Sequence, residues 1–95
     1  MSDLPARVTK VVVDLLAYYC GVEKSFITMD LRVQEDLGLD SIDAAAMLIV
    51  LQEFVATRDP TIEIEVSSFE AITTVGGIVE TVVAILPADV EAAPL

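Results

Sequence analysis

Apolar residues recur at helical spacing through the first twenty positions of the chain. Between residues 4 and 19 they fall every three or four positions, as on the buried stripe of an amphipathic helix. Asp3 or Ser2 can supply an N-cap, and Gly21 is a natural residue to follow the last turn. The pattern therefore predicts a first helix over roughly residues 4–19. Its stripe consists of Val8, Val11, Val12, Leu15, Leu16 and Tyr19.

A second helix is predicted from Ser41 to about residue 57. Asp40 is its expected N-cap, and Pro60 prevents its continuation. One broad apolar face of this helix is expected to join the core. That face consists of Ala44, Met47, Leu48, Leu51, Phe54 and Val55.

The same helix also carries apolar residues on its other side, next to Glu53. An apolar patch bordered by carboxylates usually marks a surface for a partner. The residues of this second side are Ile42, Ala45, Ala46 and Ile49.

The last third of the chain predicts one more long helix and one short helix. Thr74 caps the long helix. Ser67 and Glu70 have the spacing of a capping box, which favours a short helix around residues 69–72. Residues 62–66 alternate between apolar and polar, but no second strand is present to pair with them, so we expect an extended loop. The stripe of the long helix consists of Val75, Ile78, Val79, Val82 and Leu86.

Residues 22–39 form a connection that is long for so small a domain. The predicted fold is all-α: a small four-helix bundle of three main helices and one short helix, with this long loop between the first two helices. The bundle is assigned to residues 1–86, and residues 87–95 are expected to form a disordered tail after Pro87. The loop residues expected to pack down are Phe26, Ile27, Leu31, Val33, Leu37 and Leu39. Those expected to stay in solvent are Glu23, Lys24, Asp30, Arg32, Glu35 and Asp36.

The chain is strongly acidic. Its 95 residues include 16 acidic and 5 basic side chains, for a net charge of −11. This charge argues against nucleic acid and anionic membranes as partners, and it favours basic proteins or divalent cations. No uncharged apolar run approaches the roughly 18–20 residues of a membrane span, and the N-terminus lacks the pattern of a signal peptide. No membrane insertion is therefore expected.

Two residue counts narrow the chemistry further. The chain has no histidine, which excludes Ser-His-Asp and Cys-His triads and most zinc sites. Asp36, Asp40 and Asp43 do not fit the EF-hand spacing, so no metal site is predicted beyond loose divalent binding. The single cysteine, Cys20, can form no intrachain disulfide and is expected to be a small buried or half-buried thiol. A reducing, cytoplasmic location fits this cysteine content.

Ser41 is the residue best placed for chemistry. A short segment containing Gly38 leads directly into the helix that Ser41 begins, so the serine hydroxyl should face solvent at a helix N-terminus. Free N–H donors and the helix dipole stabilise negative charge there, and Asp40 and Asp43 would direct an attached phosphodiester outward. Ordinary helix capping by the Asp-Ser pair is the alternative. A hydrolase that uses Ser41 is set aside because the chain has no histidine.

The segment Asp36-Leu37-Gly38-Leu39-Asp40-Ser41-Ile42-Asp43 closely resembles the attachment motif of acyl carrier proteins. The first helix, Leu31-Arg32-Val33, Ile62-Glu63-Ile64 and Thr73-Thr74-Val75-Gly76 follow in family order, so the resemblance covers nearly the whole domain. It implies that Ser41 receives a 4′-phosphopantetheine arm from coenzyme A through a magnesium-dependent phosphopantetheinyl transferase. Acyl groups would be carried as thioesters on the thiol of that arm, and the chain itself would be a non-catalytic carrier.

The resemblance also implies how partners are recognised. Acyl-transferring and chain-modifying enzymes of the family present basic patches to the second helix and to the segment before it. A monomeric, cytoplasmic protein is expected, and the start at Met1 favours a free-standing one. In the family, growing chains can also retreat into the bundle core. The positions that match the partner surface are Asp40, Asp43 and Glu53, with Ile42 and Ile49 as apolar contacts.

Departures from the family pattern leave the pathway open. Ala46 and Gln52 stand where glutamates are common in fatty-acid carriers, and Gly77 stands where an aspartate is common. A carrier for polyketide or modified-lipid biosynthesis is therefore as well supported as one for fatty-acid biosynthesis. An aminoacyl or D-alanyl carrier with the same arm is a further alternative. So is a helical protein-interaction module without a prosthetic group, which the apolar face around Ile42 and Ile49 would serve.

Overall fold

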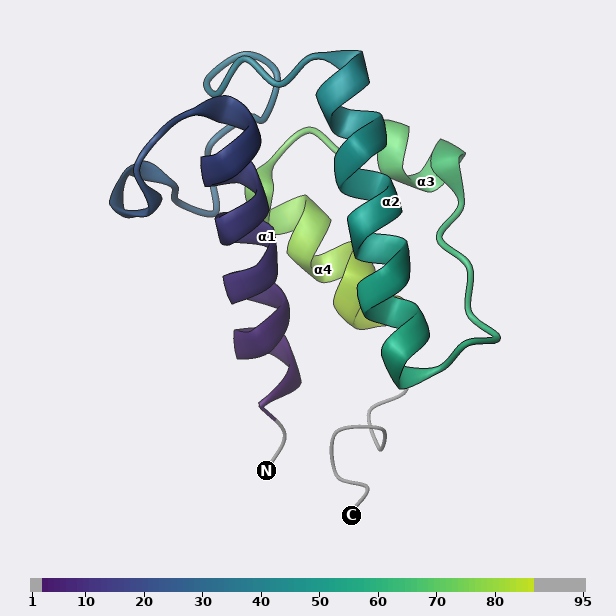
Figure 1. The fold of residues 1–95 in the computed structure, drawn as a ribbon. Coiled ribbons are helices and arrows are strands. Elements are labelled where there is room, and N and C mark those ends of the chain that lie inside the picture. Colours follow the sequence, from purple (N-terminus) through teal and green to yellow (C-terminus); the bar gives the residue numbers. More distant parts are fainter. Residues whose placement is uncertain (1–2, 87–95) are drawn as a thin grey trace.

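Three long helices and one short helix make up most of the structure, a computed structural model that describes residues 3–86 (Figure 1). The elements are α1 (Leu4–Cys20), a 3-10 turn η1 (Lys24–Phe26), α2 (Ser41–Arg58), α3 (Val66–Glu70) and α4 (Val75–Ile85). This arrangement confirms the predicted all-α, four-helix fold with its long loop between the first two helices. The tail predicted at residues 87–95 lies outside the described residues.

The core forms where the apolar stripes of the three long helices meet. Figure 1 shows α4 crossing between α1 and α2, with its closest packing against α1. The predicted stripes of α1, α2 and α4 all contribute buried residues, because each helix places one apolar face toward the other two. The core residues that are essentially inaccessible to solvent are Val8, Val12, Leu16, Met47, Leu51, Val55, Val75, Ile78 and Val82.

The ends of α1 test the predicted caps. Gly21 follows the helix with φ of 69°, and its N–H donates to the carbonyl of Ala17 at 3.0 Å. This is the left-handed termination that favours glycine, as predicted. At the other end Asp3 occupies the N-cap position, but its side chain makes no capping hydrogen bond. The predicted side-chain cap is therefore wrong for Asp3, and Ser2, the alternative cap, lies outside the described residues.

The short helix begins earlier than the sequence predicts. α3 starts at Val66 after Glu65, whose side chain forms no cap, and Ser67 lies inside the helix. The predicted capping box is therefore not formed. The helix places Phe69 in the core, with 9% of its surface exposed. Burial of this aromatic side chain, worth roughly 1.5–3 kcal/mol, outweighs the local preference of a serine for the cap.

The long loop packs onto the bundle as predicted, with one exception. Leu31 is half-buried, and the predicted charged residues all stay exposed. Phe26 is 55% exposed, so its predicted packing is wrong. It ends η1, and the following residue, Ile27, takes the inward position in its place. The loop residues that are buried are Ile27, Val33, Leu37 and Leu39.

Backbone hydrogen bonds tie this loop to the start of α4. The N–H of Val33 donates to the carbonyl of Thr73 at 2.9 Å, and the N–H of Gly76 donates to the carbonyl of Met29 at 2.8 Å. A Cβ at position 76 would lie 3.1 Å from that carbonyl oxygen, so glycine permits the close approach. The loop is thereby held against the bundle just before it reaches α2.

Candidate functional site

The N-terminus of α2 brings the candidate residues together. Ser41 is the first helical residue and is exposed. Asp40 precedes it in an extended conformation, and its carboxylate accepts a hydrogen bond from the N–H of Asp43 at 2.8 Å. The Ser41 hydroxyl forms no hydrogen bond within residues 3–86. Because Asp40 carries out the capping, capping gives no reason for a serine at position 41.

The lead-in segment, residues 37–40, fixes where Ser41 emerges. Leu37 and Leu39 are both buried, whereas Gly38 between them is exposed and has φ of 74°. This left-handed conformation strains other residues and suits glycine. The N–H of Leu39 donates to the carbonyl of Val33 at 2.9 Å. The two buried leucines therefore anchor the segment in the core. The chain then leaves the core and reaches solvent at Ser41.

The electrostatics around Ser41 combine unpaired donors with two carboxylates. The N–H groups of Ser41 and Ile42 have no acceptor in the described part of the chain, as is usual in the first turn of a helix. These donors and the helix dipole attract negative charge, while Asp40 and Asp43 repel it. A negatively charged group attached to the Ser41 oxygen is thus stabilised at its attachment point and directed away from the helix.

Cys20, at the end of α1, lies within the electrostatic reach of this acidic helix end. Burial raises the pKa of its thiol, and the nearby carboxylates of Asp43 and Asp40 raise it further. The side chain is half-buried, as predicted. The thiol therefore stays protonated and weakly nucleophilic at neutral pH.

The apolar side of α2 is open to solvent, as predicted. Ile42 is 78% exposed and Ile49 is 63% exposed, and Ala45 and Glu53 are also exposed. Ala46 is half-buried. Positions 42, 45, 49 and 53 share one face of a helix by their spacing. The structure thus brings Ile42, Ile49 and Glu53 into one exposed strip that begins beside Ser41, while Asp40 precedes the helix and Asp43 is half-buried in its first turn.

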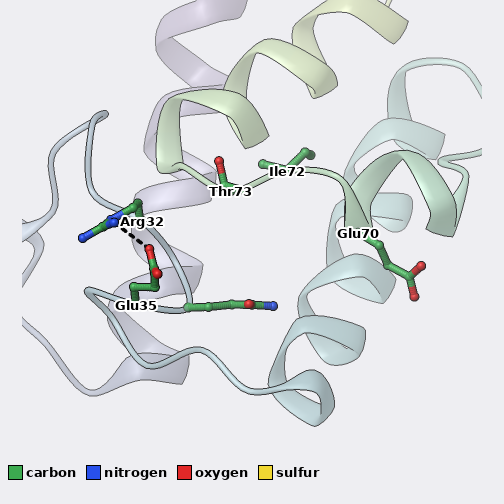
Figure 2. A pocket seen from close by; sticks show the side chains of 6 residues that line it. Arg32, Glu35, Glu70, Ile72 and Thr73 are labelled. Carbon is green, nitrogen blue, oxygen red and sulfur yellow. Dashed lines mark ion pairs between the residues drawn. The ribbon is translucent and has the colours of Figure 1, made fainter.

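The sequence did not predict a pocket beside the long loop. It is open, has a volume of about 250 Å³, and lies between the loop and the chain that joins α3 to α4. Figure 2 shows Arg32 and Glu35 on the loop side, with Ile72 and Thr73 opposite. Its walls come from segments about 40 residues apart, so no local pattern could have revealed it. Gln34 and Glu70 complete the lining.

Within residues 3–86, no three His, Cys, Asp or Glu side chains are grouped closely enough to hold a metal ion. In the same part of the chain, no helix has both the length and the apolar character needed to cross a bilayer.

No known family model matches the chain.

Proposed function

We propose that this chain is an acyl carrier protein whose Ser41 oxygen is the attachment point for 4′-phosphopantetheine, transferred from coenzyme A by a phosphopantetheinyl transferase. The observation that carries the proposal is the exposed hydroxyl of Ser41, without a hydrogen bond in residues 3–86, at the start of an 18-residue helix. The resemblance of residues 36–43 to the family's attachment motif supports it.

The residues present suit a phosphodiester at this position. The unpaired N–H groups of Ser41 and Ile42 can donate to phosphate oxygens, and the helix dipole adds a favourable field. Asp40 caps the helix by accepting a hydrogen bond from the N–H of Asp43, and this cap keeps Ser41 in its exposed position at the first helical residue. The attached group supplies a thiol on which acyl groups are carried as thioesters. The chain's own residues position that arm and direct it outward, and partner enzymes carry out the catalysis.

The exposed strip of α2 is the proposed docking surface for those enzymes. Glu53 is its acidic member, Ile42 and Ile49 add apolar contact, and the exposed Asp40 and half-buried Asp43 add negative charge at the start of the helix. Basic patches on acyl-transferring and chain-modifying enzymes complement this strip. Exposed charges of this kind speed encounter and set orientation, and their effect falls as ionic strength rises. We propose a monomeric, cytoplasmic carrier for fatty-acid, polyketide or specialised lipid biosynthesis, with an aminoacyl or D-alanyl carrier as the variant.

The second candidate is a helical interaction module without a prosthetic group. The high exposure of Ile42 and Ile49 on one face favours it, because contiguous exposed apolar surface often marks an interaction site. It differs from the carrier in requiring nothing of Ser41.

Intact-mass measurement separates the two candidates. The chain is incubated with coenzyme A, magnesium and a broad-specificity phosphopantetheinyl transferase, beside Ser41→Ala and Ser67→Ala. Ser67 is the matched control, because it is also an exposed serine in the first turn of a helix. We expect one phosphopantetheine on the wild type and on Ser67→Ala, and none on Ser41→Ala. An unmodified wild type, with a known carrier labelled in the same reaction, would favour the interaction module.

A further inference from the structure

We propose that Arg32 and Asp36 form a positioning clip, which holds the lead-in segment so that Ser41 is presented to the transferase in one fixed conformation. The clip lies in the long loop, outside the strip of α2 that forms the proposed docking surface. The sequence predicted only that both side chains stay in solvent. This inference rests on the proposed function, because it concerns how fast Ser41 is modified.

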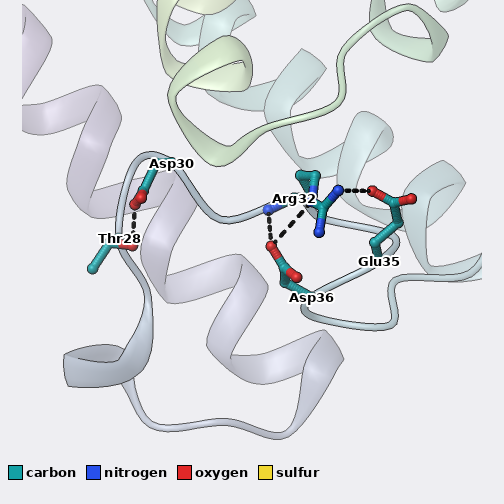
Figure 3. Close-up of polar contacts among 5 residues, drawn as sticks. All are labelled: Thr28, Asp30, Arg32, Glu35 and Asp36. Atoms are coloured by element: carbon teal, nitrogen blue, oxygen red, sulfur yellow. Dashed lines mark hydrogen bonds and ion pairs between the residues drawn. The ribbon is translucent and has the colours of Figure 1, made fainter.

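The clip is a closed set of contacts between two residues (Figure 3). Asp36 Oδ2 accepts one hydrogen bond from the Arg32 backbone N–H at 2.8 Å and another from Arg32 Nε at 3.4 Å. In return, the Asp36 N–H donates to the Arg32 carbonyl at 2.8 Å. The far side of the guanidinium pairs with Glu35, with 2.7 Å between Nη1 and Oε1. The backbone hydrogen bond and then the guanidinium lower the pKa of Asp36, so the clip is closed at neutral pH.

Arg32 is itself fixed to the start of α4. Its backbone forms an antiparallel bridge with Thr74, and the N–H of the next residue, Val33, donates to Thr73 at 2.9 Å. In Figure 2, Arg32 and Thr73 lie on neighbouring segments at the edge of the pocket. The carbonyl of Val33 in turn accepts the N–H of Leu39 at 2.9 Å. Arg32 thus connects the start of α4 to Asp36, at the beginning of the turn that precedes Ser41. Val33 connects it to Leu39, near the end of that turn.

The carboxylates near the lead-in segment repel one another, and the clip offsets part of this repulsion. Glu35, Asp36 and Asp40 lie within six positions of one another, and Arg32 supplies the cation that pairs with two of them. Without Asp36, the backbone N–H of Arg32 loses its acceptor. Without Arg32, the carboxylates of Glu35 and Asp36 lose their counter-charge. In Arg32→Gln, repulsion among the carboxylates then favours open conformations of the turn. In Asp36→Ala, the lost hydrogen bond to the Arg32 N–H has that effect.

The effect is expected to be local because the clip is exposed. The side chains of Arg32 and Asp36 are 56% and 31% accessible, and exposed ion pairs contribute little to global stability. The core residues of the three long helices lie elsewhere. Loss of the clip should therefore increase local opening around residues 37–40 without unfolding the bundle.

The test compares Asp36→Ala and Arg32→Gln with Asp14→Ala. Asp14 is the matched control, because it is a similarly exposed carboxylate with two lysine partners, but it lies in α1. Each apo protein is treated with transferase and coenzyme A, and kcat and KM are measured with the apo protein as varied substrate. We expect both clip variants to lose about tenfold in kcat with little change in KM, since misplacing a reacting group slows the chemical step. Asp14→Ala should match the wild type.

Hydrogen exchange at the amides of Gly38 and Leu39 supplies a readout independent of modification. We expect faster exchange in both clip variants, with urea midpoints close to that of the wild type. Unchanged kcat in both variants overturns the inference. So does a rise in KM alone, which would mean that the transferase contacts these side chains directly. If the wild type is not modified at all, the proposed function fails. Hydrogen exchange then still tests whether the clip holds the turn, and unchanged exchange rates at Gly38 and Leu39 in the clip variants would show that it does not.

Discussion

The side chain of Gln52 accepts a hydrogen bond from the backbone N–H of Ile64 at 2.6 Å. Its Nε2 also donates to the carbonyl of Ile62 at 2.8 Å. One amide thus satisfies two backbone groups of the extended segment after α2 and holds that segment in place. A glutamate at this position could accept but not donate when ionised. The glutamine at position 52 therefore has a structural reason.

Gln52→Glu should destabilise the fold. The carbonyl of Ile62 loses its donor in a half-buried position and faces a negative charge, so we expect a loss of about 1–3 kcal/mol in the free energy of unfolding. Urea unfolding at pH 7 measures it, and Gln34→Glu is the control because Gln34 is exposed on the loop. Near pH 4 the deficit should shrink, because a protonated glutamate can donate. A stability equal to that of the wild type at pH 7 would contradict the bridging role.

Leu51 and Ile49 lie two positions apart on α2 and should respond differently to truncation. Leu51 is fully buried, so Leu51→Ala leaves a cavity and is expected to lower the free energy of unfolding by about 2–5 kcal/mol. Ile49 is 63% exposed, and Ile49→Ala should change it by less than about 0.5 kcal/mol. Urea unfolding of both variants checks the two values. A large loss for Ile49→Ala would mean that this side chain belongs to the core and not to an open surface.

The long helices could be predicted from the sequence because each carries one apolar stripe that only a helix places on a single face. The capping roles of Asp40 and Thr74 followed from local chemistry in the same way, and both side chains accept the expected hydrogen bonds. Ser41 could be singled out because its position depends on the helix start alone. These features require information from only a few neighbouring residues.

The features that could not be predicted depend on contacts between distant segments. α3 begins where burial of Phe69 requires it, although Ser67 and Glu70 have the spacing of a capping box. The bridge between Arg32 and Thr74 joins positions 42 residues apart, which no periodicity reports. Gln52 has the same property, since its partners lie beyond the end of its own helix.

Cys20 should react slowly with thiol reagents. Burial, Asp43 and Asp40 all raise the pKa of its thiol, so the thiolate fraction at pH 8 is smaller than in a free cysteine. We expect alkylation by iodoacetamide to be slower than for glutathione at the same pH, and to accelerate as the pH rises. Asp43→Asn should raise the rate modestly. Once Ser41 is modified, a second, fast-reacting thiol should be added to the slow one. Reaction of Cys20 as fast as glutathione would contradict this account.

The bond between Asp36 and the Arg32 backbone predicts a pH dependence below neutrality. The pKa of Asp36 is lowered in the folded chain, chiefly by the Arg32 N–H and then by its guanidinium. The folded state therefore binds this proton less tightly than the unfolded state. The carboxylate's contribution to stability is complete above the ordinary aspartate pKa of 3.8 and is lost as the pH falls through the lowered value. From pH 7 to 5 the clip should remain closed.

The amide resonance of Arg32 reports this titration directly, because its N–H donates to the carboxylate. We expect its chemical shift to stay constant from pH 7 to 5 and to change with a midpoint below 3.8. In Asp36→Asn that change should vanish, while Asp14, whose pKa is lowered by Lys24 and Lys10, should still titrate as in the wild type. A midpoint at or above 3.8, or a shift that persists in Asp36→Asn, would show that another group controls this amide and that the clip does not hold in solution.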